Sequence, residues 1–268
     1  SERLKESGAT VLYGLPPMKV HSKLMLIEKS GGLYVGLSTG NLNETTARLY
    51  VDSILFTSHK KIARDVATVF DYFERVAANR ALTPPVFKHL LVSPFNTRKM
   101  LHKLINREKA KGKDGYILIK ANHLTDTGIV QRLREAADAG VRIHLIIRTT
   151  YAVTPHKNIK AVSILDRFLE HQRIYVFGRG EDATVYMSSA DLMERNLDWR
   201  VEAAFPLLSP ELRRQAIEMV QLQVKDNSKA RRLDQLQSNK YVLHRRGVHR
   251  AQYETYEYFG KMIAPEDA

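Results

Sequence analysis

The chain has 268 residues, 44% of them hydrophobic, and its 42 basic and 29 acidic side chains give a formal net charge of +13 and a pI near 9.8. Cysteine is absent, which excludes disulfides, thiolate catalysis and zinc–thiolate sites. No apolar run reaches the ~18 residues of a membrane-spanning helix, and the N-terminal SERLKESG lacks the form of a signal peptide. The charge predicts a polyanionic partner, with a solvated basic surface as the alternative.

In the first 80 residues the patterns predict four strands followed by one helix. The expected strands are 9–13, 20–28, 33–38 and 51–57. Gly31 and Gly32 are typical of a hairpin between the second and third strands. Apolar residues keep helical spacing over 59–77, and the stretch 79–85 is interpreted as a linker.

After this linker, strand-like and helix-like segments alternate. LLVSP leads to a helix expected at 96–112, GYILIKAN leads to one at 126–139, and the run VRIHLII ends at Arg148. This alternation predicts an α/β fold with a largely central sheet.

The chain also repeats itself at an offset of 150 residues, from His21 to His171. The matched pairs include Lys23/Arg173, Val35/Val185, Ser38/Ser188, Asn41/Asp191, Glu44/Glu194, Val51/Val201 and Asp52/Glu202. Because 170–226 repeats the element order of 20–76, we predict two similar α/β half-domains with mixed central sheets. We place them at 1–80 and 81–268, and expect the first to be truncated at its N-terminus and the second to end in a basic helical tail.

The repeated histidines predict a site that transfers phosphoryl groups. The segment VHSKLMLIE reads H-x-K-x4-E and resembles the H-x-K-x4-D signature of the phospholipase D superfamily. This resemblance implies that the two α/β half-domains are phospholipase-D-like. On a strand, His21 and Lys23 point to the same face. A neutral imidazole can attack phosphorus, while lysine and asparagine hold the phosphate oxygens. A structural histidine on a half-buried strand is the alternative.

Four ordered motifs resemble the polyphosphate kinase family, which moves the terminal phosphate of ATP onto polyphosphate. They are VHSKL at 20–24, STGNLNETTARLYVD at 38–52, RFLEHQRIYVF at 167–177 and SSADLMERNLDWRVE at 188–202. VSPFNTRKML at 92–101 is also similar to the segment that leads into the last domain of that family. The resemblance covers nearly the whole chain, from about Val11 to Gln252.

The resemblance implies a role for each matched residue. His21 would be the autophosphorylated nucleophile, and His171 would contact nucleotide phosphate and assist transfer. Tyr50 would line the ATP pocket and Arg148 would grip phosphate, whereas an ordinary strand tyrosine and a solvated strand-end cation are the alternatives. Second-rank phosphate contacts, each open to interpretation as a structural ion-pair member, are Lys23, Asn41, Asn43, Arg48, Arg173, Arg195 and Arg200.

The expected activity is reversible transfer of the ATP γ-phosphate to polyphosphate through a phosphohistidine. Mg²⁺ is expected to enter with ATP, with its ligands upstream of this chain and none within it. We expect ATP, ADP and polyphosphate as partners, and no nucleic acid. We expect the full-length protein to be a homo-oligomer. Its expected location is the cytoplasm or the inner face of the membrane. The isolated chain could be inactive.

Two rival functions stay open. A superfamily phosphodiesterase or nuclease is favoured by Glu28, but the second copy has Gly178 at the corresponding position. A non-catalytic polyanion-binding module is the rival from another class; it predicts salt-sensitive binding that survives loss of both histidines.

Overall fold

The computed structural model describes residues 2–12, 14, 16–80, 83–243 and 247–263. The first 80 residues contain α1 (Glu2–Glu6), β1 (Lys19–Val20), β2 (Lys23–Lys29), β3 (Gly32–Ser38), α2 (Glu44–Leu49), β4 (Tyr50–Val51), β5 (Ile54–Thr57) and α3 (Lys60–Ala77). Then follow β6 (Leu91–Ser93), α4 (Thr97–Lys109), β7 (Tyr116–Leu124), α5 (Thr127–Asp138), β8 (Arg142–Tyr151), β9 (Ile159–Ile164), β10 (Leu169–Glu170), β11 (Arg173–Phe177), β12 (Thr184–Ser188), α6 (Glu194–Asp198), β13 (Arg200–Pro206), α7 (Pro210–Lys225), β14 (Ala230–Arg232) and α8 (Ala251–Ile263). Short 3₁₀ turns occur at Gly112–Asp114 and Gly180–Asp182.

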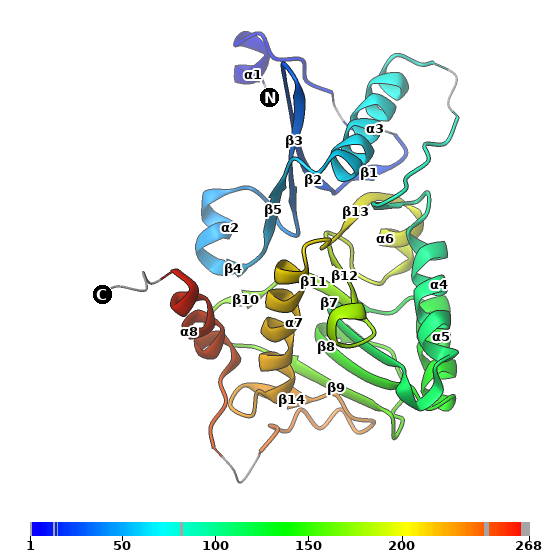
Figure 1. The fold of residues 1–268 in the computed structure, drawn as a ribbon, viewed down its shortest axis with the longest axis vertical. Helices are drawn as coiled ribbons and strands as arrows, with labels where there is room; N and C mark the ends of the chain where they lie inside the picture. Colours follow the sequence, from blue (N-terminus) through cyan, green and yellow to red (C-terminus); the bar gives the residue numbers. More distant parts are fainter. Residues whose placement is uncertain (1, 13, 15, 81–82, 244–246, 264–268) are drawn as a thin grey trace.

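The described strands form one large mixed sheet, a small antiparallel sheet and a parallel pair of β4 with β10. Figure 1 shows their arrangement. The large sheet has the order β1-β13-β12-β11-β7-β8-β9-β14, with β6 paired to β13. The pairs β7–β8, β8–β9 and β1–β13 are parallel, while the other pairs of this sheet are antiparallel. The small sheet has the order β2-β3-β5. The predicted α/β class with a mixed central sheet is therefore confirmed.

Successive side chains of the large sheet point to opposite faces of the sheet, and both faces are buried under helices. Leu118 of β7 belongs to the hydrophobic cluster that includes α3 and α7, whereas Ile117 and Ile119 belong to the cluster that includes α4 and α5. All three side chains are at most 2% exposed, and each contributes roughly 1.5–3 kcal/mol by burial. Helices on both faces explain why residues 116–119 of this strand form a continuous apolar run rather than an alternating one.

The repeat predicted from sequence is present in the strand register. Lys23 pairs with Ser38 across β2–β3, and Arg173 pairs with Ser188 across β11–β12, the same positions at an offset of 150. A β-turn joins β2 to β3 at Gly31, whose φ of 98° suits glycine. The predicted element order of 20–76 and 170–226 is therefore confirmed, and α2 and α6 are an additional helix in each copy.

The two copies exchange short strands, and this exchange positions the site. β1 of the first copy pairs with β13 of the second, with Val20 opposite Val201, while β10 of the second pairs with β4 of the first, with Glu170 opposite Val51. The continuous strands predicted at 20–28 and 51–57 are each interrupted, because their first residues join the other copy. His21 and Asp52 lie in these interruptions.

Two sequence predictions were wrong. Residues 9–12 form no strand; their side chains are exposed or half-buried, so no packing supports extended pairing, and Tyr13 lies outside the described residues. The C-terminal tail is not a basic helix: Lys229, Arg231, Arg232 and Lys240 lie in or beside β14, and Arg250 precedes α8. Helix α8 itself contains a single basic residue, Lys261, and His244, Arg245 and Arg246 lie outside the described residues.

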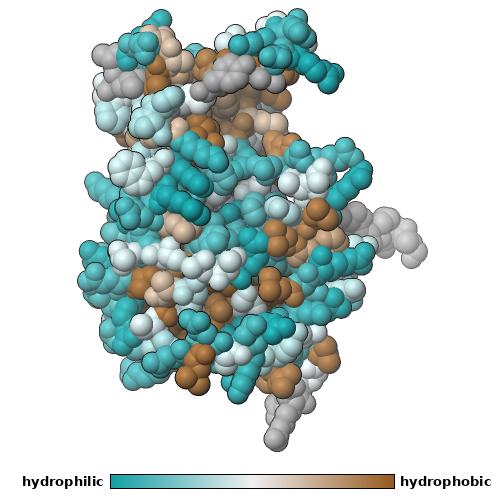
Figure 2. All heavy atoms as spheres, turned by 180° about the vertical axis from the view of Figure 1, so that it is seen from behind, coloured by the Kyte–Doolittle hydropathy of each residue, from teal (hydrophilic) through white to brown (hydrophobic). Residues whose placement is uncertain are grey.

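The face of the molecule drawn in Figure 2 is mainly hydrophilic. Figure 2, seen from behind, shows hydrophobic side chains in separate small groups on a mostly hydrophilic face. Among the described helices, none is long and apolar enough to cross a bilayer.

Candidate active site

Each repeated histidine is held by a carboxylate from the opposite copy. The Nδ1 atom of His21 lies 2.9 Å from Oε2 of Glu202, and Nδ1 of His171 lies 2.9 Å from both carboxylate oxygens of Asp52. The backbone repeats the exchange, because the His21 amide donates to the Val201 carbonyl at 2.9 Å and the His171 amide donates to the Val51 carbonyl at 3.3 Å. The two halves therefore assemble one paired site.

These contacts define the tautomer of each imidazole. A carboxylate can only accept a hydrogen bond, so Nδ1 carries the proton and Nε2 carries the lone pair. Glu202 is 1% exposed and also accepts from Ser189 Oγ at 2.5 Å and from Asn196 Nδ2 at 2.7 Å. Thr39, the equivalent of Ser189, donates to Asp52 at 2.7 Å. Hydrogen bonds from these hydroxyl and amide donors therefore fix the orientation of both carboxylates.

The two cations of the repeat bind the backbone beside their own histidines. Lys23 donates from Nζ to the His21 carbonyl, and Arg173 donates from Nη1 to the His171 carbonyl at 2.8 Å. Burial lowers the pKa of the Lys23 ammonium to about 8, against the opposing attraction of Glu202. Arg173 also donates to Nε2 of His171 at 3.1 Å, so the lone pair of that imidazole is engaged.

Tyr50 lies beside His171, and Arg148 lies within electrostatic reach of Tyr50 and Arg173. The Tyr50 ring is 5.0 Å from the His171 ring, centroid to centroid, and tilted by 50°. Burial lowers the pKa of the half-buried Arg148 guanidinium, and the nearby charge of Arg173 lowers it further. Its Nε atom is buried without a partner, and among the described residues no hydrogen bond or ion pair engages this guanidinium. An unpaired, partly desolvated cation is suited to binding an anion.

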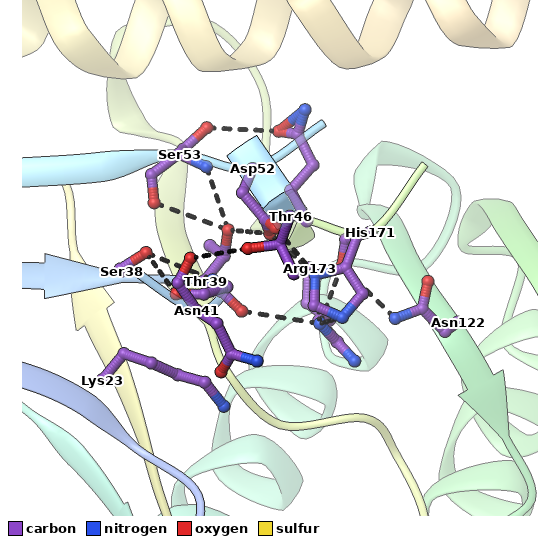
Figure 3. A network of polar contacts seen from close by, with 12 residues as sticks. Lys23, Ser38, Thr39, Asn41, Thr46, Asp52, Ser53, Asn122, His171 and Arg173 are labelled. Carbon is purple, nitrogen blue, oxygen red and sulfur yellow. Dashed lines mark hydrogen bonds and ion pairs between the residues drawn. The ribbon is translucent and has the colours of Figure 1, made fainter. Parts of the chain in front are cut away.

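Figure 3 shows Asn41 and Lys23 pointing into the same space beside His171 and Arg173. Arg200 is half-buried on β13, and its positive charge adds to the effect of burial in lowering the pKa of Lys23. In the repeat, Arg200 is the equivalent of Tyr50: it pairs next to His21 as Tyr50 pairs next to His171. Arg195 is exposed on α6 and lowers the pKa of His123 together with burial and Arg148. These cations extend the site outward.

Two second-rank candidates have structural partners on the exposed helix α2. Asn43 caps this helix by accepting from the amides of Thr45 and Thr46, at 2.9 and 3.2 Å. Arg48 forms an exposed i,i+4 ion pair with Glu44. Neither residue contacts a histidine in the described structure.

The carboxylates that orient the histidines were missed as site residues by sequence reasoning. Asp52 and Glu202 match each other in the repeat, which is the signal that could have identified them. Asp191 was also missed: it binds Arg173 through both oxygens, at 3.2 and 2.9 Å, and accepts from the amides of Asn122 and His123. The His123 side chain lies at the edge of the same charged region.

The fold and the site define an α/β protein in which two repeated halves share one paired-histidine site. A solved structure of a phosphatidylserine synthase from Haemophilus influenzae shares this fold, with a TM-score of 0.53 and 12% identity over 91% of this chain and 69% of that one.

Family comparisons are more specific. A model described as polyphosphate kinase C-terminal domain 1 matches residues 1–79, and one described as polyphosphate kinase C-terminal domain 2 matches residues 90–252. The chain belongs to the polyphosphate kinase family, which confirms the resemblance stated from sequence.

Individual relatives agree. Polyphosphate kinase from Escherichia coli K12 is 40% identical over 99% of this chain and 40% of its own length, and that from Vibrio parahaemolyticus is 41% identical over 90% of this chain and 36% of its own length. The crystal structure of polyphosphate kinase from Porphyromonas gingivalis matches with a TM-score of 0.89 and 37% identity, over 97% of this chain and 42% of that one. The chain thus spans about two fifths of the length of these relatives.

Proposed function

We propose that this chain catalyses reversible transfer of the ATP γ-phosphate to polyphosphate, with His21 as the phosphorylated nucleophile. One observation carries the proposal. Nδ1 of His21 is held by Glu202 from the opposite half, while Nε2 has no hydrogen-bond partner among the described residues. An oriented lone pair beside the Lys23 ammonium is what attack on a phosphoryl group requires.

The reaction would proceed in two displacements. The Nε2 lone pair of His21 forms a bond to the γ-phosphorus, the bond from that phosphorus to the bridging oxygen breaks, and ADP leaves with the electron pair. A terminal oxygen of polyphosphate then attacks the same phosphorus and the P–N bond breaks, which restores the imidazole. Reversal of both steps forms ATP from ADP and polyphosphate.

The surrounding cations would stabilise charge on the transferring group. Lys23 and Arg148 would hold non-bridging oxygens, and Tyr50 would offer a ring face and a hydroxyl to the nucleotide. His171 would contact the phosphates and assist, and Asp52 keeps its imidazole oriented. Asn41, Arg173, Arg195 and Arg200 would extend this phosphate-binding surface.

Magnesium belongs to the proposal only as part of the ATP complex, where it neutralises phosphate charge when bound. Among the described residues no group of three or more histidine, aspartate or glutamate side chains could hold a metal ion. Asp52 and Glu202 are committed to the histidines.

The partners in this proposal are ATP, ADP and polyphosphate, and a homo-oligomer would be the assembled form. A cytoplasmic location would supply the nucleotide. The net charge of +13 supports attraction of a polyanion.

The test is incubation with γ-labelled ATP. It uses the purified chain and a chimaera in which the chain replaces the matching region of the E. coli enzyme, with the unmodified E. coli enzyme as positive control. We expect acid-labile, base-stable label that polyphosphate discharges, and none in the His21→Ala variants. Label that persists at full strength in those variants would refute the proposal. So would hydrolysis of an added phosphodiester to a monoester and an alcohol, or salt-sensitive polyphosphate binding with no label in either protein.

A further inference from the structure

The two halves of the site differ in charge at Tyr50 and Arg200 and, next to the repeated cations, at Asn41 and Asp191. The latter two positions follow the same serine of the repeat, Ser38 and Ser188, by three residues. The carboxylates that orient the histidines do not distinguish the halves, because both lie 2.9 Å from Nδ1. The cations do not distinguish them either, since each binds the carbonyl of its own histidine.

In the second half the cation is neutralised within its own copy. Asp191 holds Arg173 through a two-point contact at 3.2 and 2.9 Å, and the two side chains are 8% exposed or less. Burial alone raises the pKa of Asp191, but Arg173 outweighs this and holds the pKa of that carboxyl below its ordinary value. The pair is therefore ionised on both sides and has no net charge. Arg173 also occupies the Nε2 lone pair of His171.

In the first half the corresponding cation stays uncompensated. Asn41 is a neutral amide, and Lys23 makes no ion pair among the described residues, although Glu202 and Asp52 attract it from farther away. Nε2 of His21 is unengaged. A phosphoryl group carries about two negative charges near neutral pH, so it is more stable beside a free ammonium than beside a neutral ion pair.

We propose that the Asn41/Asp191 difference selects His21 over His171 as the histidine that carries the phosphoryl group. Asn41 and Asp191 act as positioning residues through Lys23 and Arg173. This inference rests on the proposed function, because it explains which of two similarly oriented imidazoles that function uses.

The test measures where phosphate attaches when binding of ATP is not required. Phosphoramidate, a small phosphoryl donor, is incubated with the purified chain, and peptide mass spectrometry gives the ratio of label on His21 to label on His171. In the unmodified chain we expect a ratio of about ten or more. A failure of the proposed function would appear as absent ATP labelling while this ratio persists.

Two variants change the selecting charges. Asn41→Asp places a carboxylate in the space into which Lys23 also points (Figure 3) and should lower His21 labelling by about tenfold. Asp191→Asn keeps an amide oxygen for the Asn122 and His123 amides but removes the charge opposite Arg173, so labelling of His171 should rise and the ratio should fall. Asn106→Asp, the same chemical change on the exposed surface of α4, is the matched control and should leave the ratio unchanged.

Thermal unfolding accompanies each variant, so that the ratio is compared between folded proteins. If one of the two variants does not fold, the other decides. A ratio near one in the unmodified chain, or a ratio that stays the same in a folded Asn41→Asp or Asp191→Asn chain, would overturn the inference.

Discussion

Nδ1 of His21 and Oε2 of Glu202 come from opposite halves of the chain, 181 residues apart, and lie 2.9 Å apart at the interface of those halves. The strand exchange that brings them together also brings His171 to Asp52. Neither half therefore completes its own histidine–carboxylate pair, and the site exists only when both copies are packed together.

Replacing the carboxylate Glu202 by an amide should abolish the usable lone pair of His21. In Glu202→Gln the amide nitrogen can donate to Nδ1, which moves the imidazole proton to Nε2. We expect phosphorylation of His21 to fall by about 10²- to 10⁴-fold, measured as the initial rate of labelling. In Asp52→Asn the His21 pair is intact, so its first labelling step should be reduced much less; equal losses in both variants would contradict this assignment.

The pKa of Lys23 predicts a loss of phosphate binding at mildly alkaline pH. Because this pKa is about 8 in the folded chain, the ammonium loses its charge above pH 8, well below the range of an ordinary lysine. Affinity for polyphosphate, measured by titration calorimetry, should decline from pH 7 to pH 9. In Lys23→Arg, whose guanidinium stays charged, the decline should be smaller; an identical pH profile would exclude Lys23 as its cause.

The same shift has a stability consequence of opposite sign. Between about pH 8 and pH 10.5 the unfolded chain binds a proton at Lys23 that the folded chain does not. The contribution of this residue to the free energy of unfolding therefore increases with pH across that window. Urea denaturation of wild type and Lys23→Met at pH 7.5 and pH 9.5 should show the wild type gaining stability relative to the variant at the higher pH.

Arg148 should matter for binding but not for folding. Its buried Nε has no partner, so Arg148→Ala removes an unsatisfied group and should leave the free energy of unfolding within about 0.5 kcal/mol. Loss of a charge-assisted hydrogen bond should weaken polyphosphate binding by roughly 10- to 100-fold. Arg48→Ala removes an exposed cation on α2 and is the matched control; a large stability loss in Arg148→Ala would show a structural role instead.

The buried pair of Lys120 and Glu170 should be the most sensitive ionic contact for stability. Both side chains are at most 3% exposed, and Gln223 and Gln252 also donate to this carboxylate. Lys120→Met leaves Glu170 charged and buried, which should cost about 3–5 kcal/mol. Lys109→Met breaks the exposed pair with Glu135 and should cost less than about 1 kcal/mol; chemical denaturation of the two variants separates these cases.

The repeat was the part of the site that sequence could predict, because His21 and His171 and their cations recur with strand periodicity. Asp52 and Glu202 are also related by this offset. If the two copies are assumed to face each other, the pattern predicts that each carboxylate binds the histidine of the other copy. The strand exchange itself was not predictable, because β1 and β4 have two residues each and no period can be measured over that length. Tertiary pairing, rather than local propensity, determines where 20–28 and 51–57 break.

For the C-terminal tail and for helix α2, the residue types do not determine the conformation or the partners of the side chains. Tail residues such as Arg231 and Arg232 are charged whether they lie on a helix or on β14, so charge alone could not distinguish these conformations. Asn43 and Arg48 lie in a motif shared with the family, yet their side chains are used locally on α2. The boundary between half-domains near residue 80 and the effects of the individual site residues stay predictions.

The linkage isomer of the phosphohistidine tests the central claim most directly. Because Glu202 holds Nδ1 of His21, only Nε2 is free to attack, so alkaline hydrolysis of the labelled chimaera should yield the Nε2-linked isomer from the peptide that contains His21. Chromatography against both isomer standards makes this measurement. Recovery of the Nδ1-linked isomer, or of label from a peptide without His21, would contradict the account.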